Sequence, residues 1–336
     1  VANNKKMFTR REIENADAAR ALYRKIGRPS EADFFFFLSK NMIRNCPVTV
    51  DDAKQAHLIY GPDLAAIKGK TTRSSAAAHV PTFEAVPIPA HITKHHQNLT
   101  LCIDFFFVQG MTFLHSVARK ISFRTVAQVP NRMRATILRE VQSIIRLYKT
   151  RGFVVQDVHA DNEFECIRND ILPTDMHVVP ADSHVGEVEQ SIRTIKERVR
   201  SAVHGLPFKR LPRLMVKELT KHAVQCLNRF PGKKGVSKEM SPNSMITGKP
   251  APDYNNMRIE FGAYAQVFED NEPSNTNKSR SVGAIALTGT GNDSGDYYFM
   301  SLATGAHLSR HNWTELPITD TAIARVEAIA ANKEQP

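Results

Sequence analysis

Residues 99–108 read LTLCIDFFFV, an almost continuous apolar run that contains one carboxylate, Asp104. A turn at residues 109–110 follows, and residues 111–117 (MTFLHSV) resume the apolar pattern. Two such runs separated by a short turn predict adjacent strands in a hairpin. A lone carboxylate within an apolar strand carries a large desolvation cost unless it binds a metal ion or another cation. Asp104 is therefore a candidate functional residue.

The elements that follow this hairpin alternate between helix and strand. Apolar residues at three- and four-residue steps over 133–148 predict a helix, which ends at the turn 150–152. Residues 153–158 predict a buried strand, 163–171 a short helix and 176–179 a further strand, before another helix. This order predicts an α/β fold with a mixed sheet flanked by helices.

The outer parts of the chain differ in composition from this centre. Residues 1–70 are expected to be mostly helical, whereas residues 71–97, rich in Ser, Ala, Thr, Pro and His, are expected to form a linker. Short apolar stretches alternate with turn residues over 260–318, which predicts a small antiparallel β-barrel-like module or sandwich. The expected regions are therefore 1–70, 71–97, a core over 98–230, a connecting segment over 231–259, 260–318 and a helical tail over 319–336.

Two further acidic residues stand where a site could form. Asp161 follows the strand at 153–158, and the carboxyl ends of strands are where such sheets place their sites. Glu189 belongs to a helix with the apolar stripe Val185, Val188, Ile192, Ile195, Val199 and Val203. Arg193, Lys196 and Arg200 share its flank. A solvated face with Glu–Arg pairs is the alternative interpretation of that flank. Carboxylates converging from distant segments are what two-metal phosphoryl transfer requires.

Positive charge is concentrated beside Glu189. The chain has a formal net charge of +11, which suits a polyanionic partner. Residues 193–221 hold nine Lys or Arg against two Glu, including Lys209 and Arg210. Cations there would neutralise DNA phosphates next to the acidic residues.

The cysteine and hydropathy patterns exclude several classes of protein. The four cysteines form no CxxC pair, which argues against a disulfide framework or a zinc ribbon and is compatible with a reducing compartment. The clustered His91, His95 and His96, with Cys102, lack the second pair that a tetrahedral zinc site needs, so linker histidines are the preferred interpretation. No apolar run approaches the roughly 20 residues of a membrane span. The initial Val suggests a fragment of a longer translated chain.

Several segments resemble the integrases of copia-type retrotransposons. IDFFFVQG at residues 103–110 is similar to the strand with the first catalytic aspartate, and HADNEFE at 159–165 resembles the second-aspartate motif. HVGEVEQSIRTIKER at 184–198 resembles the segment with the catalytic glutamate, and FGAYAQV at 261–267 a segment after the core. The resemblance extends from about residue 20 to about residue 317.

The resemblance implies a ribonuclease-H-like core and a function. The expected activity is metal-dependent transfer of DNA 3′ ends into double-stranded DNA by a homo-multimer inside the cell, in nucleus and cytoplasm. It implies that Asp104, Asp161 and Glu189 are catalytic and hold two Mg²⁺ or Mn²⁺ ions. The basic residues expected to contact DNA are Arg193, Lys196, Arg200, Lys209 and Arg210.

The sequence also departs from the family pattern. The interval from Asp161 to Glu189 is shorter than in retroviral relatives, and the glycines usual after the second aspartate are missing. Tyr23 and Arg28 stand where the family's pre-integrase segment has zinc-binding histidines, so zinc is not expected. A decayed or domesticated DNA-binding copy is therefore the alternative function. A third hypothesis is that the chain is a ribonuclease H or a related nuclease, but this hypothesis does not explain the carboxyl-terminal β module.

Overall fold

A mixed five-stranded sheet in the order β3-β2-β1-β4-β5 contains the strand that bears Asp104. In this computed structural model β1 pairs with β2 and β2 with β3 in antiparallel fashion, whereas β4 runs parallel to β1 and to β5. The strands are β1 Asn98–Val108, β2 Met111–Ala118, β3 Arg124–Gln128, β4 Val154–Asp161 and β5 Asp175–Val179. The predicted mixed sheet is confirmed, and β3 is a strand that the sequence analysis missed.

The structure describes residues 1–336 except for 71–83, 180–185, 233–234, 270–277, 293–294 and 333–336. The chain forms two compact units, each assembled from separated segments. One unit contains residues 1–78, 259–286 and 296–328, and the other contains 79–258, 287–295 and 329–336. The sheet β1–β5 belongs to the second unit.

The helices of the second unit are α6 Ala90–His96, α7 Arg134–Lys149, the 3₁₀ helix η1 Asn162–Asp170, α8 Gly186–Gly205, α9 Arg213–Asn228, α10 Pro242–Thr247 and the short 3₁₀ helix η2 Tyr254–Asn256. Helices α7, η1 and α8 lie where the sequence predicted helices, whereas α6, α10 and η2 fall in segments that it assigned to a linker or a connection. Residue Ile92 of α6 is fully buried in the core of this unit.

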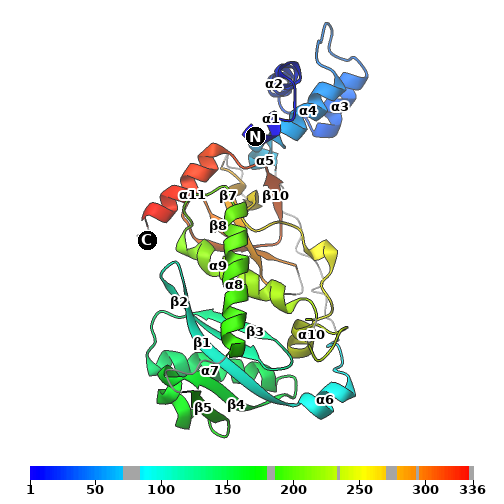
Figure 1. The fold of residues 1–336 in the computed structure, drawn as a ribbon. Coiled ribbons are helices and arrows are strands. Elements are labelled where there is room, and N and C mark those ends of the chain that lie inside the picture. Colours follow the sequence, from blue (N-terminus) through cyan, green and yellow to red (C-terminus); the bar gives the residue numbers. More distant parts are fainter. Residues whose placement is uncertain (71–83, 180–185, 233–234, 270–277, 293–294, 333–336) are drawn as a thin grey trace. The chain divides into compact units, whose positions relative to one another are not determined.

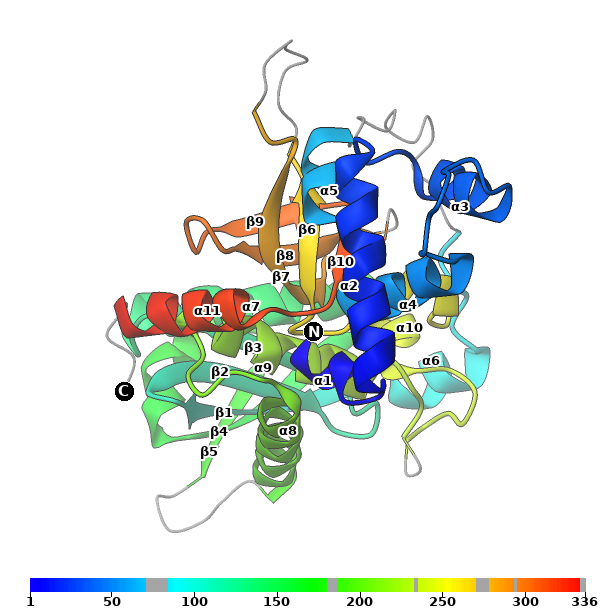
Figure 2. The ribbon, with the colours of Figure 1, turned by 90° about the horizontal axis from the view of Figure 1, so that it is seen from above.

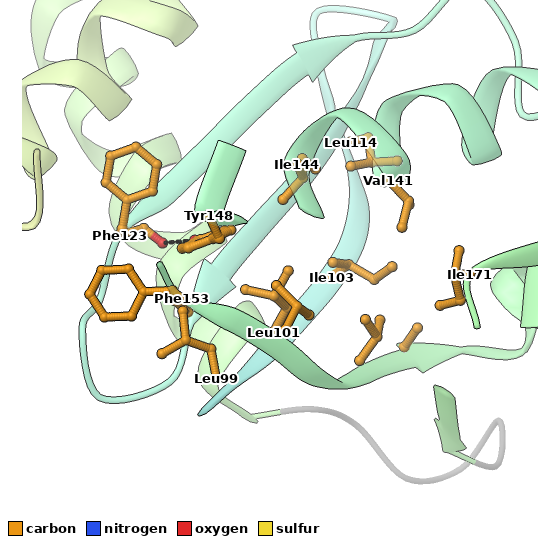
Figure 3. Packing of buried hydrophobic residues seen from close by; sticks show 14 of the residues in the cluster. Leu99, Leu101, Ile103, Leu114, Phe123, Val141, Ile144, Tyr148, Phe153 and Ile171 are labelled. Carbon is orange, nitrogen blue, oxygen red and sulfur yellow. Dashed lines mark hydrogen bonds between the residues drawn. The ribbon is translucent and has the colours of Figure 1, made fainter. Parts of the chain in front are cut away.

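One face of the sheet forms the main hydrophobic core (Figure 3). Leu101 and Ile103 point from β1 toward the α7 side chains Val141, Ile144 and Tyr148. Successive residues of a strand point to opposite faces, so Cys102, Asp104 and Phe106 occupy the other face of β1. Helix α8 packs against β1 and β2 (Figure 1). Its Ser191 contacts His115, the β2 residue paired with Asp104, so α8 covers the face that carries Asp104.

Strand β3 lies at the edge of this sheet, where one row of backbone groups has no strand partner. The side chain of Asn228, at the end of α9, supplies hydrogen-bond partners for one residue of this row, Arg124. Its Nδ2 donates to the Arg124 carbonyl at 2.7 Å, and its Oδ1 accepts from the Arg124 N–H at 3.0 Å. A helix side chain thus pairs the edge as a neighbouring strand would.

The first unit combines amino-terminal helices with a second sheet (Figure 2). Its helices are α1 Ala2–Lys5, α2 Arg10–Lys25, α3 Glu31–Ser39, α4 Val50–Tyr60 and α5 Leu64–Lys70. Strands β6 Tyr264–Phe268, β7 Ser281–Gly289, β8 Tyr297–Ser301, β9 His307–Arg310 and β10 Trp313–Leu316 form the order β10-β6-β7-β8-β9, and α11 Asp320–Asn332 follows. The last residues of β7, from 287, and of α11, from 329, are grouped with the second unit. The strand-rich carboxyl-terminal module expected from the sequence is therefore a five-stranded sheet.

Two of the amino-terminal helices, α2 and α4, begin at capping boxes, which satisfy backbone donors at their first turns. Thr9 and Glu12 form the box of α2, and Thr49 and Asp52 form that of α4. Among the described residues, no helix combines the length and apolar character needed to cross a bilayer.

Candidate active site

Two of the three predicted acidic residues meet through strand pairing. The parallel pairing of β1 with β4 sets Cys102 beside His159. Asp104 and Asp161 each follow this pair by two residues on their own strands, and the charge of Asp161 acts on Asp104. Both lie on the face opposite the hydrophobic core, since side chains alternate along each strand. Residues distant in sequence are thus brought together on rigid neighbouring strands.

Asp104 experiences an excess of negative charge. Its side chain is half-buried, and its Oδ1 accepts a hydrogen bond from the Phe105 N–H at 2.6 Å. Burial raises the pKa of Asp104 from its usual 3.8 to about 6, against the effect of the Phe105 hydrogen bond. This value of about 6 for the pKa also includes the smaller raising effects of the charges of Asp161, Glu163 and Glu189. Charges act in this way only at short range, so these four carboxylates share one neighbourhood.

Glu189 lies exposed in the first turn of α8, beside the stripe with which that helix packs on the sheet. The buried residues of that stripe are Val188, Ser191, Ile192, Ile195 and Val199. The predicted amphipathic helix is therefore present. Residues 184 and 185, with which the sequence motif and the predicted stripe begin, lie outside the described residues.

The arrangement only partly forms a metal-binding site. Within the described ranges, no three or more Asp, Glu, His or Cys side chains are arranged to hold an ion. Asp104 and Asp161 are neighbours, whereas Glu189 influences Asp104 electrostatically without completing a ligand set. The donor chemistry nevertheless fits Mg²⁺ or Mn²⁺, which prefer carboxylate oxygens. Burial is the main cause of the raised pKa of Asp104, the neighbouring negative charges add to it, and a bound cation would offset both effects.

Glu187 is the other acidic residue at the start of α8, and it has a partner. Its Oε1 lies 2.9 Å from Nε of Arg119, at the end of the β1–β2 hairpin. This pair lies near Cys102, since both of its charges act on that thiol. The pKa of Cys102 is raised to about 11, mainly by burial and also by the charge of Glu187. The charge of Glu189 acts on Asp104, and this favours Glu189 over Glu187 as the third acidic residue of the site.

Glu163 is a member of this neighbourhood that the sequence analysis did not single out. Its Oε1 lies 2.5 Å from Arg132 Nη1, and the Arg132 guanidinium lies 5.7 Å from the ring centroid of Phe107. Glu163 directly follows Asp161-Asn162, where the family motif has glycine. A carboxylate two residues after Asp161, where the motif that this segment resembles has glycine, was the signal that could have identified it.

The predicted DNA-contacting residues differ in exposure. Arg193, Arg200, Lys209 and Arg210 are exposed. Lys196 is partly buried, with Nζ 5.9 Å from the ring centroid of Phe106 on β1. Lys196 thus lies over the strand that carries Asp104, whereas Lys209 and Arg210 lie in the connection between α8 and α9.

Tyr23 and Arg28, which were compared with zinc-binding histidines in the sequence, make other contacts in the structure. The Tyr23 hydroxyl donates to the Pro29 carbonyl at 2.9 Å, and Arg28 Nε lies 3.1 Å from Asp63 Oδ1. Tyr23 thus ties α2 to the turn that follows it, and Arg28 ties that turn to Asp63, just before α5.

Comparisons with known proteins give a structural match alone. No family model matches the chain, and no curated protein matches it in sequence. Among solved structures, 305 chains match. One is the catalytic core domain of BIV integrase, which is 15% identical with a TM-score of 0.33. The match covers 44% of this chain and 93% of that chain, so it concerns the chain path of less than half of this molecule.

Proposed function

We propose that this chain is a polynucleotidyl transferase of the integrase class, similar to those of copia-type retrotransposons, which joins DNA 3′ ends to a target duplex. The observation that carries the proposal is that Asp104 and Asp161 lie on the neighbouring parallel strands β1 and β4, with Glu163 and Glu189 close enough for their charges to act on Asp104. Repelling carboxylates held on neighbouring strands favour binding of cations. The motif similarity around Asp161 and Glu189 gives the finer assignment to copia-type elements.

Asp104, Asp161 and Glu189 would hold the divalent ions. Such ions supply an activated attacking oxygen and stabilise the leaving one. The role of the protein is positioning: β1 and β4 fix the two aspartates, and α8 carries Glu189 along the same face. Arg193 and Arg200 are exposed on α8 and would neutralise the phosphates of a bound duplex. A multimer would hold the element ends and the target together.

The alternative is a DNA-binding relic that no longer catalyses. It is favoured by one observation, since the described carboxylates form no complete ligand set. The basic residues of α8 would be retained in both cases. If the wild-type chain binds DNA but shows no metal-dependent strand transfer, the alternative of a DNA-binding relic is the correct one.

Strand transfer on a short DNA duplex with Mg²⁺ or Mn²⁺ tests the proposal. Asp104→Asn, Asp161→Asn and Glu189→Gln should each abolish product formation, with circular dichroism spectra unchanged. Asp157→Asn is the matched control, because Asp157 lies on β4 and hydrogen-bonds to His177 at 3.1 Å. Full activity of Glu189→Gln would exclude the third ligand, and full activity of Asp104→Asn would refute the proposed chemistry.

A further inference from the structure

His115 is a fully buried histidine at the centre of the sheet, and the proposed chemistry does not use it. It lies on β2, directly opposite Asp104 in the antiparallel pairing of β1 with β2. Its ring contacts two other elements, because Nδ1 lies 2.7 Å from the Thr125 carbonyl on β3 and Nε2 lies 2.9 Å from Ser191 Oγ on α8. One side chain thus joins the strand next to β1 with the helix that carries Glu189.

The partners of this ring determine the direction of each hydrogen bond. The Thr125 carbonyl can only accept, so His115 Nδ1 carries the hydrogen and the neutral ring leaves Nε2 as an acceptor. The Ser191 hydroxyl must therefore donate to Nε2. Its oxygen in turn accepts from Arg124 Nε at 3.0 Å. The chain Arg124–Ser191–His115–Thr125 is complete, with each of these donors matched to one acceptor.

Ser191 is only 4% exposed, so the loss of its hydrogen bonds would leave buried polar groups without partners. It is also two residues from Glu189 in the same helix. With side chains a helix is about 12 Å across, so a rotation of about 10° displaces the end of a side chain by about 1 Å. A displacement of about 1 Å at a catalytic group can cost about 10²-fold in rate. The rotational setting of α8 therefore matters to the site.

We propose that His115, acting through Ser191, is a positioning residue that sets the rotation of α8 and thereby the place of Glu189 relative to Asp104 and Asp161. Its catalytic consequence rests on the proposed function. The buried side chains of Ile192 and Ile195 pack α8 against the sheet. Apolar contacts have no preferred direction, so they constrain the rotation of the helix less than a hydrogen bond does. The directional contact of His115 and Ser191 is what selects one rotation.

The test uses the full chain with three substitutions on α8. Ser191→Ala removes the hydroxyl, and Ser191→Thr retains it. Ser201→Ala is the matched control, because Ser201 is exposed on the same helix and donates to the Glu197 carbonyl at 3.0 Å. Strand-transfer kinetics on the duplex substrate with Mg²⁺ and amide hydrogen exchange of residues 186–192 are measured for each variant.

Ser191→Ala is expected to lower kcat by about 10²-fold with KM for DNA unchanged, and to speed exchange over 186–192. Ser191→Thr should restore most of kcat, and Ser201→Ala should match the wild type. Equal losses in Ser191→Ala and Ser191→Thr would overturn the proposal, because packing alone would then explain them. Wild-type kcat and exchange in Ser191→Ala would also overturn it. If the wild type is inactive but Ser191→Ala still speeds exchange, the proposed function fails while the link from His115 to α8 stands.

Discussion

Replacing Asp104 with Asn should stabilise the metal-free protein while abolishing its activity. The pKa of Asp104 rises from 3.8 to about 6, so at pH 7 the folded state holds a carboxylate that it disfavours. About two pKa units correspond to roughly 3 kcal/mol, which we reduce to about 2 kcal/mol because the side chain is only half-buried. Asn removes the charge, and its Oδ1 can still accept from the Phe105 N–H. Charge relief should therefore exceed any loss of contact.

Urea unfolding in EDTA at several pH values measures this effect. A folded-state pKa above the unfolded value means that the wild type gains stability from protonation of Asp104 below pH 4 and loses it as pH rises to about 6. Asp104→Asn should thus match the wild type near pH 4 and exceed it by about 2 kcal/mol at pH 7. Asp157→Asn on β4 should give no such gain. Mg²⁺ should stabilise the wild type and not Asp104→Asn. Unchanged or lower stability of Asp104→Asn at pH 7 would contradict the charge relief expected from this substitution.

Three further outcomes are expected. Burial lowers the pKa of His115 to about 4, so its contribution to stability is present above pH 6.5 and is lost as pH falls toward 4. The pH slope of the urea midpoint in that window should shrink in His115→Gln, and an unchanged slope would contradict the burial argument. Lys196→Ala should lower the log–log salt slope of duplex binding by about 0.9. Arg198→Ala should lower this salt slope less, since the Arg198 charge acts on Arg124 at the sheet edge. Equal changes in slope for the two variants would contradict a role in DNA binding for the α8 flank that carries Lys196. Metal analysis after dialysis should find less than one zinc per chain, because Tyr23 and Arg28 replace ligands; a stoichiometric zinc would overturn this.

The sequence alone identified the elements whose pattern is local. The apolar run around Asp104, the helical periodicity of α7 and the stripe of α8 each lie within one short segment. These patterns predicted a mixed sheet flanked by helices, and the isolated carboxylate in β1 marked the candidate site. A period of two or of 3.6 residues is a property of neighbours in the chain, so it can be read without a structure.

Other features of the fold and the candidate site depend on residues that are far apart in the sequence, and these features appear only in the tertiary structure. Strand β3 has no alternating burial, and it exists as a strand because β2 pairs with one edge and Asn228 with the other. The adjacency of Asp104 and Asp161 depends on the register of β1 against β4, which no local pattern encodes. The nearness of Glu163 to Asp104 and the link from His115 to Ser191 arise in the same way. Hydrogen bonding and charge interaction act over a few ångströms in space, and only the folded chain brings these residues within that range.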